Sequence, residues 1–345
     1  MFSILYFSTT LLRASEKRLW YDEICTLYIC RLPTFGEAWA AVLHGADYNP
    51  PLFYVLQRAG MSVFGDGLIA MRLPAMIMFW VLCLCLFFVA RRRAGFLAGW
   101  TAMLLPLITG AYFYSYEARP HGMVLGFCAL ALLCWQRIEE DPSSYGWLLG
   151  FSLSILAASL THCYAVLSIV PFALAETVHT FRLRTVRWRI WAAFIAPALI
   201  AAAFLIPLLK SYKTMLQSAG FSDIFVANPR LLPMFYSQVL QSSLLALIAL
   251  TALLAFSWTA AQAGSVVQGK VAEMRTRAEI ALTIGFIGMP FYGLVIARLG
   301  KGPFIVRYFM SAVIGIALAV ALCVGLRLQR RYAWLFVLLL TCFAG

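Results

Sequence analysis

The chain has 345 residues, of which 63% are hydrophobic and 12% are charged, and its mean hydropathy is +0.86. A soluble domain has about 45–50% apolar and about 25% charged residues, so this composition excludes a soluble fold and makes lipid the solvent. The net charge of +13 comes from basic residues spread through short loops without a nucleic-acid-binding motif, and we therefore exclude nucleic acid as a partner.

Membrane-spanning helices are the expected elements, because a span requires about 20 apolar residues. Apolar runs of suitable length occupy 68–90, 94–114, 120–136, 145–161, 163–180, 190–209, 239–261, 279–297 and 308–326. Shorter apolar runs lie at 1–12 and 332–345, and we expect that one or both ends of a longer protein are missing. The prediction is a single all-α integral membrane domain over residues 1–345, a bundle of about 10–11 transmembrane helices with amphipathic juxtamembrane helices.

The distribution of basic residues among the loops predicts the orientation of the chain. Dense runs such as Arg91–Arg93 and the arginines of 182–189 lie beside span ends, as cytoplasmic loops do under the positive-inside rule. The loops 13–67, 115–119, 210–238 and 298–307 then face the opposite side, which in a bacterial inner membrane is the periplasm. The inner loop Arg137–Pro142 contains Glu139 and is interpreted as a solvated linker.

The first outer loop, 13–67, begins with a cluster of ionisable and aromatic residues. Asp22 and Glu23 follow Trp20 and Tyr21 directly, just beyond the end of an apolar run. Solvated residues within an interfacial aromatic belt are the alternative interpretation of this cluster.

The same loop is predicted to contain two short amphipathic helices. Thr34 and Glu37 have capping-box spacing, which predicts a surface helix over Phe35–His44. A second helix is predicted at the prolines that follow Asn49, because proline suits the first helical position. These helices would hold the polar cluster over the bundle.

Further ionisable residues lie at the outer ends of spans, where they are functional candidates by default. Arg72 lies near the start of one span, Glu117 and Arg119 occupy the short second outer loop, and Arg307-Tyr308 opens another span. The alternatives are a stabilising salt bridge between Glu117 and Arg119, and an Arg307 that snorkels to the interface.

Five short motifs follow one another along these outer segments: Trp20-Tyr21-Asp22-Glu23, Asn49-Pro50-Pro51-Leu52-Phe53-Tyr54, Arg72-Leu73-Pro74, Tyr116-Glu117-Ala118-Arg119-Pro120 and Arg307-Tyr308. In this order, from about residue 14 to 326, the sequence resembles the multi-pass GT-C glycosyltransferases related to protein O-mannosyltransferases and to the aminoarabinose transferases of lipid A. Two departures are visible. Asn49 stands where relatives often carry His, Asp or Glu, and many relatives continue into a further span and a soluble outer domain.

The resemblance implies a GT-C-like bundle and a transferase whose donor is a sugar on a polyprenyl phosphate. The acceptor would be a glycan, a lipid or a protein. The resemblance assigns the catalytic base to Asp22. We expect Glu23 to belong to the same catalytic site, with a supporting role in orienting the loop. Adjacent residues on a helix point about 100° apart, so a single base and an inverting displacement are expected. Arginine suits phosphate through its planar fork, and the candidate phosphate and substrate ligands are Arg72, Arg119, Arg307, Glu117, Tyr308 and Asn49.

The sequence leaves the cofactor open, with a divalent metal as one candidate. The four histidines are scattered, and His162 alone lies at a predicted outer hairpin tip. It is a weak candidate ligand for metal or phosphate, and an interfacial histidine with satisfied hydrogen bonds is the alternative.

Two other classes of function fit a protein with many spans and outer cations. A transporter or flippase of lipid-linked sugars is the main alternative, although transporters usually place ionisable groups near the bilayer midplane, often in inverted repeats. Here the charged residues gather at one side, which favours an enzyme. A structural subunit with a decayed site is the third interpretation.

Overall fold

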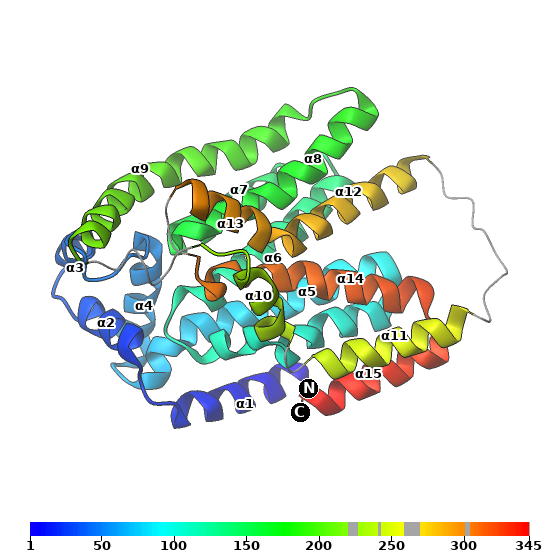
Figure 1. Cartoon of the computed structure of the whole chain (residues 1–345), viewed down its shortest axis with the longest axis horizontal. Helices are drawn as coiled ribbons and strands as arrows, with labels where there is room; N and C mark the ends of the chain where they lie inside the picture. The colour runs from blue at the N-terminus through cyan, green and yellow to red at the C-terminus, as the bar shows by residue number, and fades with distance from the viewer. Residues whose placement is uncertain (220–226, 241–242, 259–269, 301–303, 345) are drawn as a thin grey trace.

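The computed structural model describes residues 1–219, 227–240, 243–258, 270–300 and 304–344, and in this part of the chain all regular structure is helical. The α-helices are α1 (Phe2–Glu16), α2 (Tyr21–Cys30), α3 (Phe35–Leu43), α4 (Pro51–Phe64), α5 (Leu68–Leu104), α6 (Pro120–Glu140), α7 (Tyr145–Thr161), α8 (Ile169–Leu183), α9 (Trp188–Ala219), α10 (Leu231–Leu240), α11 (Leu244–Trp258), α12 (Lys270–Ile287), α13 (Met289–Leu299), α14 (Ala312–Arg327) and α15 (Arg330–Ala344). Short 3₁₀ helices are η1 (Leu105–Ile108), η2 (Gly110–Tyr116), η3 (Cys163–Ser168) and η5 (Val306–Phe309). Figure 1 shows the long helices running along the longest axis of the molecule, with α2, α3 and α4 gathered at one end. The predicted all-α fold is confirmed.

Several of the predicted spans can be identified by length and composition in the described part of the chain. Within the described ranges, four helical segments are sufficiently long and apolar, or five if a pair bent by 52° between α12 and α13 counts as one span. Helices α7, α10 and α14 are apolar but shorter than 18 residues. The predicted run 239–261 lies partly outside the described residues.

One of these four segments, Leu68–Ile108, is a helical hairpin. Ala94 and Gly95 have non-helical backbone angles, and the positive φ of 85° at Gly95 is one that glycine adopts without a Cβ penalty. The Phe87 ring lies 6.2 Å from the Trp100 ring, whereas 13 residues of straight helix would separate them by roughly 20 Å. The chain therefore reverses at this point, between the predicted runs 68–90 and 94–114.

The centre of the bundle depends on close approach between helix backbones. Helix α5 packs against α6 and α14. A Cβ added at Gly126 of α6 would lie only 2.2 Å from the Met78 carbonyl oxygen of α5. Small residues permit this distance between helices in lipid, where packing rather than water exclusion holds them together.

The first outer loop folds into three short helices. The predicted helix over Phe35–His44 is α3, and Thr34 Oγ1 accepts a hydrogen bond from the Glu37 amide at 3.2 Å. The predicted proline-initiated helix is α4, which begins at Pro51. The additional helix, α2, begins at Tyr21, so Asp22 and Glu23 lie in its first turn, where the helix dipole favours negative charge.

The interpretation of Arg137–Pro142 as a solvated linker is wrong for Glu139. Glu139 is buried inside the bundle and is only 6% exposed. Its carboxylate forms a salt bridge with Arg187 and lies 2.7 Å from His179 Nε2. Arg187 also binds Glu176 of α8 at 2.6 Å. Helix α6 extends to Glu140, one turn beyond the predicted run 120–136, and carries Glu139 onto its buried face.

Candidate active site

Asp22 and Glu23 point in different directions from the first turn of α2, as expected of neighbours on a helix. The Asp22 side chain retains 20% of its exposure, whereas the Glu23 side chain is fully buried. The two carboxylates therefore have different surroundings and different tasks.

Glu23 joins three segments of the chain. Its carboxylate accepts hydrogen bonds from Arg72 Nε and Nη2, both at 2.9 Å, from Lys17 Nζ at 2.8 Å and from the Ala118 amide at 2.8 Å. Burial raises the pKa of Glu23, but the bonds from Arg72, Ala118 and Lys17 outweigh it, and the pKa is lowered. This geometry gives Glu23 a role in positioning α2 rather than in the reaction.

The structure does not support the phosphate role predicted for Arg72. This arginine is completely buried, and its guanidinium donates to Glu23 and to the carbonyl oxygens of Ala14, Lys17 and Arg18. These bonds fix the segment between α1 and α2 to α5. A phosphate would have to break them, so Arg72 is a structural residue.

The Glu117 carboxylate forms no salt bridge with Arg119, so the alternative of a stabilising pair between these two residues is wrong. Its Oε1 instead lies 3.2 Å from Lys17 Nζ, and its Oε2 has no hydrogen-bond partner among the described residues. Burial raises the pKa of Glu117 against the opposing effect of Lys17. Glu117 is thus a buried carboxylate with one oxygen available.

Arg119 binds a residue to which the sequence assigned no role. Its Nη1 and Nη2 donate to Asp47 at 2.8 and 3.3 Å, and Nη1 also reaches the Asp22 carbonyl oxygen at 3.2 Å. Its Nε lies 3.9 Å from Asp22 Oδ2 and makes no hydrogen bond in the described part of the chain. Burial lowers the pKa of Arg119, but the Asp47 carboxylate outweighs it and raises the pKa, so Arg119 is permanently charged.

Asp47 lies in the same outer loop as Asp22, immediately before Tyr48-Asn49-Pro50. The predicted substrate ligand Asn49 is 2% exposed and donates to Asp47 at 2.9 Å. The presence of an aspartate just before the proline motif could have marked Asp47 as a candidate site residue. The sequence does not show, however, that Asp47 is buried or that it faces Arg119.

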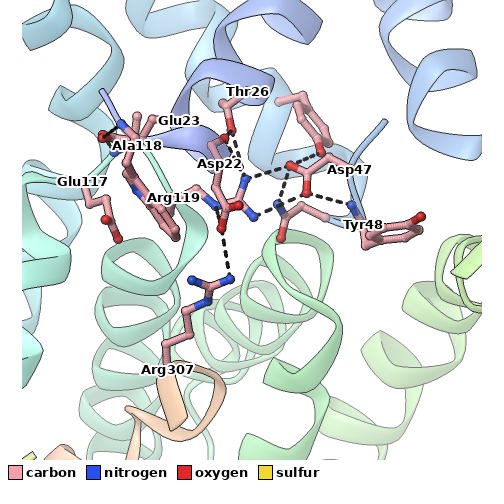
Figure 2. A network of polar contacts seen from close by, with 12 residues as sticks. Asp22, Glu23, Thr26, Asp47, Tyr48, Glu117, Ala118, Arg119 and Arg307 are labelled. Atoms are coloured by element: carbon pink, nitrogen blue, oxygen red, sulfur yellow. Dashed lines mark hydrogen bonds and ion pairs between the residues drawn. The ribbon is translucent and has the colours of Figure 1, made fainter. Parts of the chain in front are cut away.

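Arg307 completes the site from η5. Its Nη2 donates to Asp22 Oδ2 at 3.0 Å, and its guanidinium lies 5.2 Å from the centre of the Trp20 ring. Figure 2 shows Arg307 reaching Asp22 from η5, while Arg119 lies between Asp22 and Asp47. Asp22 thus stands between two guanidinium groups.

Tyr308 and His162 lie beside this cluster as ring partners. Their ring centroids are 4.6 Å apart, the Tyr164 ring is tilted against Tyr308, and the His121 ring stacks on Tyr308. Burial and the adjacent Arg119 and Arg307 lower the pKa of His162 to about 3, so this ring is neutral. Among the residues that the structure describes, no group of three or more His, Cys, Asp or Glu could hold a metal ion.

Part of the sequence matches a protein-family model, and the fold matches a solved structure. Residues 48–210 match the family model of the dolichyl-phosphate-mannose-protein mannosyltransferases, a segment with Asn49, Arg72, Glu117 and Arg119 but without Asp22 and Arg307. The fold is similar to that of ArnT from Cupriavidus metallidurans bound to undecaprenyl phosphate, with a TM-score of 0.57 and 15% identity. The apo form of ArnT gives a TM-score of 0.54 and 14% identity. No curated protein matches the sequence significantly.

The fold and the family match give the class that this chain resembles: it is an integral membrane protein with an ArnT-like all-α fold, and residues 48–210 are similar to the mannosyltransferase family. The chain is thus similar to the protein mannosyltransferases in part of its sequence and to ArnT in its fold, the two groups that the motifs of the sequence resemble. The similarity to ArnT covers 98% of this chain and 62% of the ArnT chain.

Proposed function

We propose that this protein is an inverting glycosyltransferase that moves a sugar from a polyprenyl-phosphate donor to an acceptor on the non-cytoplasmic, periplasmic face of a bacterial inner membrane. The observation that carries the proposal is the position of Asp22, a partly exposed carboxylate with Arg307 at 3.0 Å and Arg119 at 3.9 Å. Such a site holds one proton acceptor and two cations of the kind that bind phosphate.

The available donors on the two arginines support an anionic ligand. Arg119 Nε and Arg307 Nε are both buried, and neither has a hydrogen-bond partner among the described residues. A buried donor without a partner costs about 1–3 kcal/mol. A phosphate placed between the two guanidinium groups would remove this cost. ArnT, with the same fold, binds undecaprenyl phosphate, which is a ligand of this chemistry.

The reaction would use these residues in a fixed order. Arg307, whose side chain is 26% exposed, turns from Asp22 to the donor phosphate. Asp22 then accepts the proton of the acceptor hydroxyl, whose oxygen forms a bond to the anomeric carbon. The bond from that carbon to the phosphate oxygen breaks on the opposite face, which inverts the configuration. The departing phosphate retains the electron pair, and the cations stabilise its charge.

The experiment is transfer by the purified full chain in liposomes, with a panel of undecaprenyl-phosphate-linked hexoses and pentoses and with glycan, lipid and peptide acceptors. The expected result is a product of inverted anomeric configuration, read by NMR, from at least one donor. A product that retains the donor configuration would exclude the single-base mechanism. Movement of the donor between leaflets without product would instead establish a flippase.

A further inference from the structure

The Asp47 carboxylate accepts hydrogen bonds from four different residues. Its Oδ2 accepts from Tyr54 Oη at 2.8 Å, from Asn49 Nδ2 at 2.9 Å and from Arg119 Nη1 at 2.8 Å. Its Oδ1 accepts from the Tyr48 amide at 2.8 Å and from Arg119 Nη2 at 3.3 Å. The carboxylate is therefore fixed on several sides and offers Arg119 a planar, two-pronged partner.

The pairing of Arg119 with Asp47 determines how Arg119 contacts Asp22. With both terminal nitrogens of Arg119 bound to Asp47, Nε is the nitrogen nearest the Asp22 carboxylate, at 3.9 Å, which exceeds hydrogen-bonding distance. The arginine side chain is 9% exposed, so it has little access to water. Without Asp47, its charge would need another carboxylate, and Asp22 already lies beside it.

We propose that Asp47 is a positioning residue that holds Arg119 beside Asp22 but not bonded to its carboxylate, so that this carboxylate remains open to the proton of the acceptor. The proposal rests on the proposed function, because it assigns to Asp47 the tuning of that same base. Arg307 and Arg119 then differ in kind: Arg307 can leave Asp22 for the donor phosphate, whereas Arg119 is held in place.

Among the described residues, the Asp22 carboxylate has two charged neighbours, and the other charged groups of the site have partners elsewhere. Arg307 approaches from η5 and Arg119 from the segment before α6, while Glu23 is turned away onto Arg72. Asp47 lies beyond Arg119, and Glu117 is paired with Lys17. A second guanidinium bonded to Asp22 would favour its ionised form and lower its basicity, an effect of about 1–3 pH units for a carboxylate beside arginine.

The test is the pH dependence of transfer in Asp47→Asn and Asp47→Glu, with the donor and acceptor that the wild type uses best. Asp47→Asn leaves Arg119 to bind Asp22, so we expect the acid limb of the kcat profile to move down by about 1 pH unit or more. The maximal rate should fall, but by less than the roughly 10²–10⁴-fold typical of a lost general base. Asp47→Glu retains the charge, and its acid limb should remain at the wild-type position.

A double variant keeps the test decisive where Asp47→Asn alone does not fold, because removing one partner of a buried pair leaves an uncompensated charge. Arg119→Gln with Asp47→Asn replaces the ion pair by two amides. If Asp47 acts only through Arg119, the acid limb of the double variant should not move down relative to the wild type, because the second guanidinium that could bond the Asp22 carboxylate is gone. A downward shift of about 1 pH unit in the double variant would overturn the proposal.

The two claims fail in different ways. An acid limb that Asp47→Asn leaves in place, with wild-type transfer intact, would overturn the positioning role alone. A wild-type chain that transfers no sugar from the panel would overturn the proposed function, and the role of Asp47 with it.

Discussion

Arg307 donates a hydrogen bond to the Asp22 carboxylate across 285 positions of sequence, at 3.0 Å. The contact joins η5, which precedes α14 late in the sequence, to the first turn of α2. It closes a site whose other charged members come from the first and second outer loops.

Loss of the Arg307 charge should weaken binding of the donor phosphate. We expect Arg307→Gln to reduce affinity for undecaprenyl phosphate about tenfold or more, because a charge-assisted bond contributes about 1.5–3 kcal/mol. Arg298→Gln is the matched control, since Arg298 lies in the last turn of α13 and is exposed. Fluorescence titration with the lipid phosphate measures both. Equal affinity in the two variants would remove Arg307 from the phosphate site.

Arg72 should behave as a structural residue. Arg72→Met leaves the buried Glu23 without its main partner, a change that costs about 3–5 kcal/mol in comparable buried pairs. The expected result is a large fall in the thermal unfolding temperature in detergent, with undecaprenyl phosphate affinity of the remaining folded protein unchanged. A specific loss of lipid-phosphate affinity at normal stability would restore Arg72 as a ligand.

Glu117 and Glu23 should influence stability with opposite pH dependence. Burial raises the pKa of Glu117, so its stabilising contribution is present at low pH and is lost as pH rises through the folded-state pKa. Glu117→Gln stays neutral and should gain stability relative to the wild type between about pH 4 and 7.

The pKa of Glu23 is lowered, so its stabilising contribution is present at neutral pH and is lost as pH falls. Glu23→Gln should therefore be less stable than the wild type at neutral pH, by a margin that shrinks in acid. Thermal unfolding across this range measures both, and parallel curves for the two variants would contradict these assignments.

The orientation is testable by thiol labelling. Ala46→Cys, in the loop beside Asp47, should react with an impermeant maleimide in intact cells, and Val186→Cys, in the arginine-rich link between α8 and α9, should not. Val186 is 40% exposed, so lack of reaction would not result from burial. Cys25, Cys163, Cys323 and Cys342 retain exposure and need to be replaced by serine in the background. The reverse labelling pattern would place Asp22 in the cytoplasm.

The helices that the sequence predicts best are those with local signals. The capping residues Thr34 and Glu37 and the proline at position 51 define α3 and α4 without reference to the rest of the chain. The reversal in α5 falls at the predicted break between the runs 68–90 and 94–114, whereas the bend between α12 and α13 interrupts the predicted run 279–297 and depends on packing between helices.

The pairing of charges in the site could not be predicted from motif order. Sequence proximity suggested Glu117 with Arg119, yet the chain path brings Arg119 to Asp47 and Lys17 to Glu117. Arg72 and Arg307 look alike as outer arginines, but one is buried against backbone carbonyls and the other remains partly exposed. Which cation meets which carboxylate depends on tertiary contacts between distant segments.

The measurement that tests the central claim most directly is sugar transfer by Asp22→Asn. This substitution keeps the shape of the side chain and removes its capacity to accept a proton. We expect transfer from the undecaprenyl-phosphate-linked sugar to fall by about 10²–10⁴-fold, as is typical of a lost general base, while the variant folds normally and still binds undecaprenyl phosphate through its arginines. Full transfer activity in Asp22→Asn would contradict the assignment of Asp22 as the catalytic base.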